Sequence, residues 1–361
     1  MPTQTYFDKC QPFPEGVPTA TLSRISYAKL LAHETDESTA LFNACRDTGF
    51  FELDFQDDTA GQAFLQTAEA MFHVTEEVHA MDVAELMKYT YQPPGWLFGY
   101  KWIGDSKVED GRLDRFAFYN VSRDDITGVM KPPLSNPSCI ESRRSLFTSY
   151  MTQAHAITTL ICSHLDVHLG LPRGTLSSLQ PLDLPSGTSL RMLYYPPHPP
   201  EDRRNSLVGH TDIGTLTILF NVVGGLQILT PGGDPQDEAS WRYTRPVPGC
   251  ALVNLGDAMV EWTAGILRSN MHRVTFAPGD QGKMPRYSLA YLVRPYGDAP
   301  MKRLSEGDSI VPGLEDGEEA NDMTAREWET YRTVAIRDGR DNARSRGGRR
   351  LDSSAKKKES R

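Results

Sequence analysis

Hydrophobic residues in the first half of the chain recur mostly at helical spacing. The pattern predicts a once-broken helix over residues 26–48, a second helix over 60–78 and a long helix over 142–169. Residues 50–55 alternate between the two faces of an extended segment, which predicts a short strand. Pro and Gly interrupt the aromatic stretch 89–100, so no regular structure is expected there.

After Pro172 the pattern changes to short segments rich in β-branched and aromatic residues, separated by turn signals such as Pro231-Gly232-Gly233-Asp234. Many short strands at this spacing predict a β-sandwich or a barrel. One more amphipathic helix is expected over residues 324–337. The predicted strands lie near residues 190–195, 207–210, 216–221, 226–229, 251–255, 272–276 and 287–293.

Charge is unevenly distributed along the 361 residues. The formal net charge is −9, but residues 340–361 carry nine basic and three acidic side chains. The tail is therefore +6 and the rest of the chain −15. An acidic body repels phosphate groups, so nucleic acid is not expected as a partner. The tail has few apolar residues and is expected to be disordered.

Other features favour a soluble, cytoplasmic protein. No apolar run approaches the roughly 20 residues that a membrane-spanning helix needs, so no membrane partner is expected. The beginning of the chain lacks the basic and apolar segments of a secretory signal. The five cysteines include no CxxC pair, which argues against a disulfide framework and against a cysteine-rich zinc site.

The strand-rich zone holds one pattern that suits a transition metal. In His210-Thr211-Asp212, the imidazole and the carboxylate point to the same face of a strand, because side chains two residues apart do so. His272 is the candidate third ligand. Two imidazoles and one carboxylate on one side of an octahedral ion leave three positions open, which is typical of non-heme Fe(II) sites. His164 and His168, four apart on the predicted long helix, lack the adjacent Glu of a helical zinc hydrolase and are interpreted as structural.

A second pattern, Arg286-Tyr287-Ser288, lies fourteen residues after His272. Arg286 and Ser288 again share one strand face. A guanidinium fork pairs with both oxygens of a carboxylate, and a hydroxyl adds a further hydrogen bond. The pattern therefore predicts a carboxylate-binding site in the same zone.

These patterns belong to a set of blocks that resembles the Fe(II)/2-oxoglutarate-dependent oxygenases, specifically the isopenicillin N synthase-like branch and its fungal natural-product members. The resemblance is firm from about Leu190 to Pro295 and looser around Cys45-Arg46-Asp47-Thr48-Gly49-Phe50-Phe51. The blocks are His210-Thr211-Asp212-Ile213-Gly214-Thr215-Leu216-Thr217-Ile218-Leu219, Gly224-Gly225-Leu226-Gln227-Ile228, Val253-Asn254-Leu255-Gly256-Asp257, Ser269 to Val274 and Arg286 to Ser288.

The resemblance implies an α+β fold, a double-stranded β-helix (a distorted, cupin-like jelly roll) flanked by helices. The expected organisation is one enlarged catalytic domain. Its segments are an N-terminal mixed region (1–135), a long supporting helix (136–185), the jelly-roll core (186–300), a C-terminal helical segment (301–339) and the basic tail (340–361).

The resemblance also implies the roles of single residues. It implies that His210, Asp212 and His272 bind Fe(II), and that Arg286 and Ser288 bind the distal carboxylate of 2-oxoglutarate. Tyr195 matches a tyrosine that hydrogen-bonds the metal-bound carboxylate of this co-substrate. Leu193 departs from the Asn that plant members usually have there, so the inner contact to the co-substrate is expected to differ. By likeness to substrate-side elements of fungal members, Lys101, Arg115 and Phe118 are candidate substrate contacts.

The implied function is a dioxygenase that uses Fe(II), 2-oxoglutarate and O₂ to oxidise a C–H bond of a small molecule, in secondary-metabolite biosynthesis. Hydroxylation, desaturation and ring formation or rearrangement are all compatible outcomes. One alternative is an oxidase of the same fold that needs no 2-oxoglutarate, as isopenicillin N synthase and the ethylene-forming oxidase do. Another is a non-catalytic jelly-roll protein whose two histidines and aspartate hold a structural zinc. None of these patterns bears on the oligomeric state.

Overall fold

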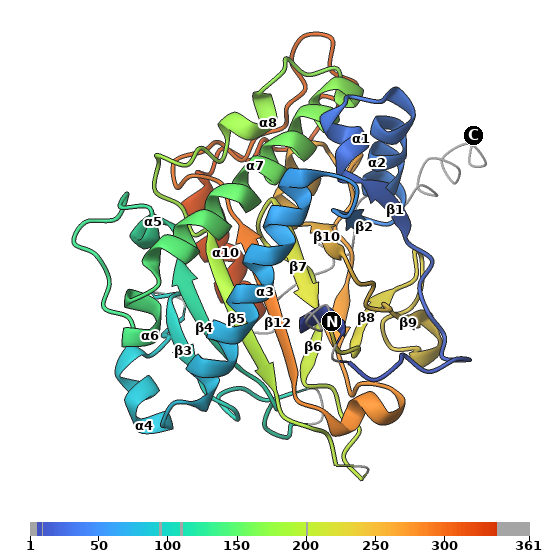
Figure 1. Ribbon diagram of the computed structural model, residues 1–361. Helices are drawn as coiled ribbons and strands as arrows, with labels where there is room; N and C mark the ends of the chain where they lie inside the picture. The colour runs from blue at the N-terminus through green and yellow to red at the C-terminus, as the bar shows by residue number, and fades with distance from the viewer. Residues whose placement is uncertain (1–5, 9, 94–95, 109–110, 200, 338–361) are drawn as a thin grey trace.

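Two β-sheets form the centre of the protein (Figure 1). The computed structural model describes residues 6–8, 10–93, 96–108, 111–199 and 201–337, and the predicted disordered tail 340–361 lies outside the described residues. The large sheet has the order β1 (Ser23–Ser26), β2 (Phe50–Asp54), β10 (Cys250–Leu255), β7 (Leu216–Asn221), β12 (Arg286–Val293), β5 (Ser189–Tyr195), β4 (Ala117–Ser122) and β3 (Gly99–Lys101). The small sheet has the order β6 (Leu207–His210), β11 (His272–Val274), β8 (Leu226–Leu229) and β9 (Trp241–Tyr243).

The strands from β5 to β12 divide evenly between the two sheets. The chain crosses from one sheet to the other at almost every connection, and all pairings among these eight strands are antiparallel. Buried residues of both sheets, among them Leu193, Leu226, Leu252 and Val274, pack together in one cluster. This arrangement is the double-stranded β-helix, so the predicted fold class is confirmed.

The first part of the chain extends the same large sheet. Strand β2 pairs with β10 at one side, and β4 pairs with β5 at the other. The strand predicted at residues 50–55 is confirmed as β2. Strand β4 was not predicted, because all six of its residues are buried and its sequence shows no alternation. Residues 241–243 form a strand of only three residues, too short to give a periodic signal.

Helices cover one face of the large sheet (Figure 1). The helices α3 and α7 lie side by side there, and α7 is the predicted long helix. It ends at Gly170, which has the left-handed φ of 68° that favours glycine after a helix. The α-helices are α1 (Tyr27–Leu31), α2 (Thr35–Asp47), α3 (Thr59–Ala80), α4 (Val83–Leu86), α5 (Arg123–Ile126), α6 (Ser138–Glu141), α7 (Arg144–Leu169), α8 (Thr175–Ser178), α9 (Asp257–Trp262) and α10 (Ala325–Arg337). Short 3₁₀ turns occur at Tyr6–Asp8, Met87–Tyr89, Glu238–Ser240 and Gly279–Lys283.

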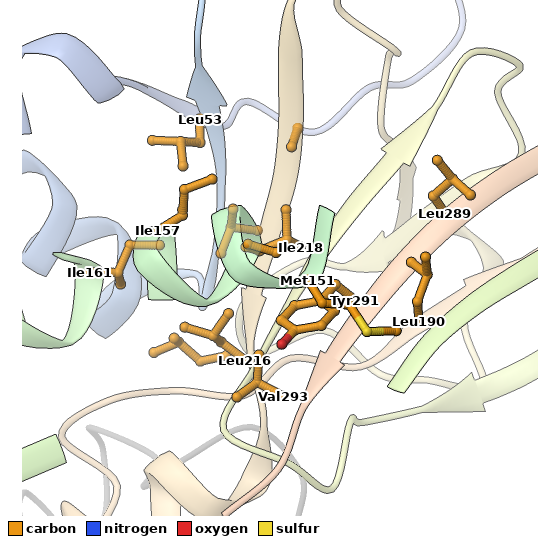
Figure 2. Packing of buried hydrophobic residues seen from close by; sticks show 14 of the residues in the cluster. Leu53, Met151, Ile157, Ile161, Leu190, Leu216, Ile218, Leu289, Tyr291 and Val293 are labelled. Carbon is orange, nitrogen blue, oxygen red and sulfur yellow. The ribbon is translucent and has the colours of Figure 1, made fainter. Parts of the chain in front are cut away.

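Strand β12 of the large sheet has one face in the main core and one face toward the small sheet. On β12, Leu289, Tyr291 and Val293 are buried in the main core, in the cluster that also holds Ile157 and Ile161 of α7 (Figure 2). The alternate residues of the same strand, such as Ser288 and Ala290, point between the two sheets because side chains alternate across a strand. The core beneath the helices thus fixes which residues face the inside of the jelly roll.

We expect Ile161→Ala to lower the free energy of unfolding by about 2–5 kcal/mol, because it leaves a cavity between α7 and the sheet. Ile161 has no exposed surface, whereas Val167 on the same helix is 53% exposed. Val167→Ala is therefore the control, with an expected change below about 0.5 kcal/mol. Urea unfolding, monitored by circular dichroism, measures the free energy of unfolding of both variants. Equal effects of the two substitutions would contradict this packing.

Candidate functional site

The structure brings the three predicted metal ligands together. His210 ends β6, His272 begins β11, and the two residues are direct partners in the antiparallel pair. Their ring centroids lie 4.3 Å apart. Asp212 follows two residues after His210, and its Oδ1 lies 3.9 Å from Nε2 of His272. One ligand atom from each of the three residues lies within 4.8 Å of the others, so the group could hold one metal ion.

Backbone carbonyls orient both imidazoles. Nδ1 of His210 lies 2.9 Å from the Val208 oxygen, and Nδ1 of His272 lies 3.2 Å from the Asn270 oxygen. A carbonyl only accepts, so each Nδ1 carries the proton. In the neutral imidazole this leaves Nε2 as the nitrogen with the free lone pair, the one that can ligate a metal.

Two side-chain hydrogen bonds fix the orientation of the Asp212 carboxylate. Its Oδ2 accepts hydrogen bonds from Thr217 Oγ1 at 2.6 Å and from Asn254 Nδ2 at 2.7 Å. Thr217 is on β7 and Asn254 on β10, so the large sheet holds one oxygen of this side chain. Oδ1 stays available for an ion on the side of His272.

Burial and charge place the ligands in their metal-binding protonation states. Burial, together with the neighbouring His272, lowers the pKa of His210 to about 4, so this imidazole is neutral at pH 7. Burial by itself would raise the pKa of Asp212. The two imidazoles and the hydrogen bonds from Thr217 and Asn254 outweigh it and hold that pKa at about 2.

The donor set fits an octahedral Fe(II) better than a structural zinc. Among the residues that the structure describes, no fourth His, Cys, Asp or Glu joins the group. A structural zinc site closes its tetrahedron with a fourth protein ligand. Two nitrogens and one oxygen, with the remaining positions free, are the donors of a non-heme Fe(II) oxygenase site.

A buried carboxylate, Asp257, ties together the segments that carry the ligands. It accepts hydrogen bonds from Thr211 Oγ1 at 2.9 Å and from Ser269 Oγ at 2.5 Å. It also forms an ion pair with Arg332 of α10 at 2.7 Å. Burial raises the pKa of Asp257, and the Arg332 charge and these hydrogen bonds oppose that rise. A side chain at the preceding Gly256 would put its Cβ 2.1 Å from the Gly214 oxygen, so only glycine allows this approach.

Arg286 and Ser288 lie together on the inner face of β12. Nη1 of Arg286 donates to Ser288 Oγ at 3.2 Å, and Nε donates to the Gly224 oxygen at 3.0 Å. Both side chains are buried, and Arg286 forms no ion pair within the described part of the chain. Burial lowers the pKa of the guanidinium. A buried, unpaired guanidinium held in a fixed orientation is well suited to an incoming carboxylate.

Tyr195 lies against Arg286. The two residues are direct partners of β5 and β12, and the guanidinium carbon lies 4.9 Å from the centre of the tyrosine ring. The sequence placed Tyr195 at the metal-bound end of the co-substrate. The strand register instead puts it beside the group predicted to hold the distal carboxylate, because paired residues point to the same face.

A cavity of about 370 Å³ includes His210 and Asp212 in its lining. Of the predicted substrate contacts, Lys101 and Phe118 line it and Arg115 does not. Lys101 is buried and forms an ion pair with Asp114 at 2.6 Å, so its charge is already neutralised. Arg115 forms an ion pair with Asp202 at 3.1 Å and donates to the Pro197 oxygen.

Several residues of the site had no assigned role in the sequence analysis. Thr217, Asn254 and Asp257 all lie within the blocks quoted for the resemblance, which was the available signal. Their partners are 5, 42 and 75 residues away in the chain, so only the fold shows what they bind. Arg191, which also lines the cavity, precedes the Tyr194-Tyr195-Pro196 motif and gave no separate signal.

The fold and this site define a mononuclear non-heme iron oxygenase. Residues 186–295 match the family model of the 2OG-Fe(II) oxygenase superfamily. A 2-oxoglutarate-dependent dioxygenase of Aspergillus fumigatus is 32% identical over 336 residues, which cover 89% of this chain and 87% of that protein. The oxidoreductase vrtI of Penicillium aethiopicum is 31% identical over 78% of this chain and 66% of its own length. The chain belongs to the 2OG-Fe(II) oxygenase superfamily.

Solved structures show the same fold. A full-length protein of Neurospora crassa, crystallised in complex with alpha-KG, superposes with a TM-score of 0.72 at 20% identity, over 91% of this chain and 99% of that one. A putative 2OG-Fe(II) oxygenase family protein of Caulobacter crescentus gives a TM-score of 0.69 at 23% identity, over 89% of this chain and all of that one.

The protein is therefore an enzyme, an oxidoreductase that uses Fe(II), 2-oxoglutarate and O₂. Within the described residues, no helix has both the length and the apolar character needed to cross a membrane.

We expect Thr217→Val to weaken Fe(II) binding about 10- to 100-fold, because one of the two hydrogen bonds that orient Asp212 is lost. The matched control is Thr158→Val on α7, where the hydroxyl bonds only the Ala154 oxygen. Anaerobic Fe(II) titration gives the dissociation constants. Unchanged affinity in Thr217→Val would remove this role from the hydroxyl.

Proposed function

We propose that His210, Asp212 and His272 hold Fe(II) and that the enzyme oxidises a C–H bond of a small molecule with 2-oxoglutarate and O₂. The observation that carries the proposal is the convergence of these three donors beside the 370 Å³ cavity, whose lining includes His210 and Asp212. Thr217 and Asn254 keep the Asp212 carboxylate in place when the ion binds. The Asp257 carboxylate keeps the two ligand segments together.

The co-substrate is proposed to bind between the triad and Arg286. A Cβ built on Gly225 would lie 2.9 Å from the Thr275 oxygen and 3.7 Å from Cδ of Arg286. The Arg286 side chain therefore lies close to the backbone of Thr275. Thr275 follows His272 by three residues, which is roughly 10 Å along an extended chain. An extended five-carbon dicarboxylate suits that separation. We assign its distal carboxylate to Arg286 and Ser288, with Tyr195 beside them.

Fe(II) and 2-oxoglutarate held here would, with O₂, supply an oxidant strong enough to break a C–H bond, one oxygen atom of O₂ going to succinate as CO₂ is released. The chain contributes the rest. Arg286 neutralises and orients the dicarboxylate, and its contacts with the Gly224 oxygen and Ser288 keep the guanidinium from turning away. Phe116, buried and stacked on Tyr195, excludes water from the proposed co-substrate site.

The substrate is proposed to be a small metabolite. A cavity of about 370 Å³ is within the size range of small-molecule sites and too small for a folded macromolecule. Hydroxylation, desaturation and ring formation all begin with the same C–H cleavage, and secondary-metabolite biosynthesis is the proposed context. The cytoplasmic location stays a prediction.

The experiment that tests the proposal measures the conversion of 2-oxoglutarate to succinate. We expect the Fe(II)-loaded protein to consume 2-oxoglutarate and O₂ and to release succinate when a metabolite mixture contains the substrate. O₂ consumption and substrate oxidation without succinate would instead identify the 2-oxoglutarate-independent oxidase of the same fold.

We expect Arg286→Lys to weaken 2-oxoglutarate binding about 10- to 100-fold, because the charge remains but the planar fork is lost. The visible absorption that develops when Fe(II) and 2-oxoglutarate bind together under anaerobic conditions reports the dissociation constant. Arg24→Lys is the control, because that arginine lies on β1 and pairs only with Asp54 at the surface. Wild-type affinity in Arg286→Lys would exclude the assigned role.

A further inference from the structure

Arg191 is a cation of the cavity lining whose charge the fold leaves unpaired. Three basic side chains line the cavity. Lys101 pairs with Asp114 at 2.6 Å, and Arg294 pairs with Glu329 at 2.8 Å. Arg191 forms no ion pair in the part of the chain that the structure describes. Desolvating a guanidinium without a counter-charge is unfavourable, so an unpaired one in a protein cavity marks the place of an anion.

Neighbouring groups fix Arg191 in one orientation. Its Nε donates to Oδ1 of Asn120 at 2.8 Å, and Nδ2 of Asn120 in turn donates to the Leu97 oxygen at 2.7 Å. The guanidinium carbon lies 4.4 Å from the ring centroid of Phe118. The hydrogen bond and the ring together set the plane of the guanidinium. Nη1 and Nη2 have no hydrogen-bond partner among the described residues and form a pair of parallel donors.

The acidic groups nearby do not use these donors. Asp212 lines the same cavity, but its Oδ2 is bound by Thr217 and Asn254 and its Oδ1 lies on the side of His272. Asp105 also lines the cavity, but its side chain is exposed to solvent and forms no ion pair with Arg191. Water screens an exposed carboxylate, so Asp105 does not neutralise the guanidinium.

Arg191 is distant from the proposed site of the distal carboxylate. On β5 it shares a face with Tyr195, the partner of Arg286, but Tyr195 lies four positions further along, about 13 Å along a strand. Arg286, Ser288 and Tyr195 do not line the cavity that holds Arg191. Arg191 therefore belongs to the cavity that His210 and Asp212 line, and we place the molecule to be oxidised in this cavity.

The remaining lining of that cavity is largely apolar. Tyr91 packs edge-on against Phe118, with ring centroids 5.0 Å apart. The apolar and aromatic lining residues include Tyr91, Leu97, Phe116, Phe118, Leu207 and Leu292. One fixed cation in a mostly apolar cavity recognises a molecule with one anionic group and an apolar body.

We propose that Arg191 binds the carboxylate of the primary substrate, so that the enzyme acts on small carboxylic acids with an apolar or aromatic body. The assignment rests on the proposed function, because it takes the triad as the reacting centre. The two free nitrogens of the guanidinium match the two oxygens of a carboxylate. Binding the acid at this point also fixes which carbon of its body lies nearest the metal, and so contributes to where oxidation occurs.

The test compares acids with their own neutral amides. The full-length protein, loaded with Fe(II) and 2-oxoglutarate without O₂, is titrated calorimetrically with 3-phenylpropanoate, 2-naphthoate and octanoate, and with the three corresponding primary amides. We expect at least one acid to bind about tenfold or more tightly than its amide. If no acid is preferred, or none binds, the proposal is wrong. This comparison needs only the wild-type protein.

Variants of Arg191 then test whether this residue causes the preference for the acid over its amide. In Arg191→Gln the preferred acid is expected to bind within about twofold of its amide, and Arg191→Lys to restore part of the difference. Arg143→Gln, which removes an arginine paired with Glu77 on the surface, serves as the control and keeps the full preference. A preference that survives in Arg191→Gln would overturn the assignment.

The same variants separate this proposal from the proposed function. The affinity of Arg191→Gln for 2-oxoglutarate, measured from the anaerobic visible absorption, is expected to stay within about twofold of wild type. A drop of about tenfold or more would assign Arg191 to the co-substrate and overturn the substrate role. Failure of the wild-type protein to bind 2-oxoglutarate with Fe(II) would instead contradict the proposed function.

Discussion

The site depends on one buried carboxylate that binds no metal. Asp257 accepts hydrogen bonds from Thr211, which lies between two ligands, and from Ser269, three residues before the third. Its backbone N–H also donates to the Asp212 oxygen at 2.7 Å. These contacts join strands of the two sheets, and Arg332 compensates the buried charge from α10. A charged carboxylate that is buried away from water is stable only when both of its oxygens accept hydrogen bonds or pair with a positive charge. The metal ligands, the loop between them and the last described helix are therefore coupled through a single side chain.

The alternation of side chains on the large sheet explains how one structure supplies both stability and chemistry. The residues of β12 that face the helices belong to the main core, whereas the alternate residues carry the proposed co-substrate site. A shift of one residue in register would exchange these faces. The packing of α3 and α7 on the sheet therefore maintains the orientation of Arg286 and Ser288 (Figure 1).

Local patterns predicted the parts of the structure whose signals are local. The strand alternation gave His210 with Asp212, and Arg286 with Ser288, and the helical spacing gave α7 nearly to its ends. The registers between strands were not predictable, because they depend on pairings between residues far apart in the chain. The pairing of Tyr195 with Arg286 is one example, and the contact of Tyr195 with the metal-bound end of the co-substrate stays a prediction. The ion pair between Lys101 and Asp114 was likewise not predicted, and a contact of Lys101 with the substrate stays a prediction.

Net charge and local charge act at different distances. The part of the chain before residue 340 carries −15, yet both proposed ligands of the interior, 2-oxoglutarate and a carboxylic acid, are anions. Surface charges are screened within about 10 Å at ordinary salt, whereas buried charges are not. Inside the jelly roll, Lys101 and Arg294 form ion pairs with acidic residues of the chain, whereas Arg286 and Arg191 form none among the described residues. This distribution separates two carboxylates that would otherwise compete for the same position at the metal.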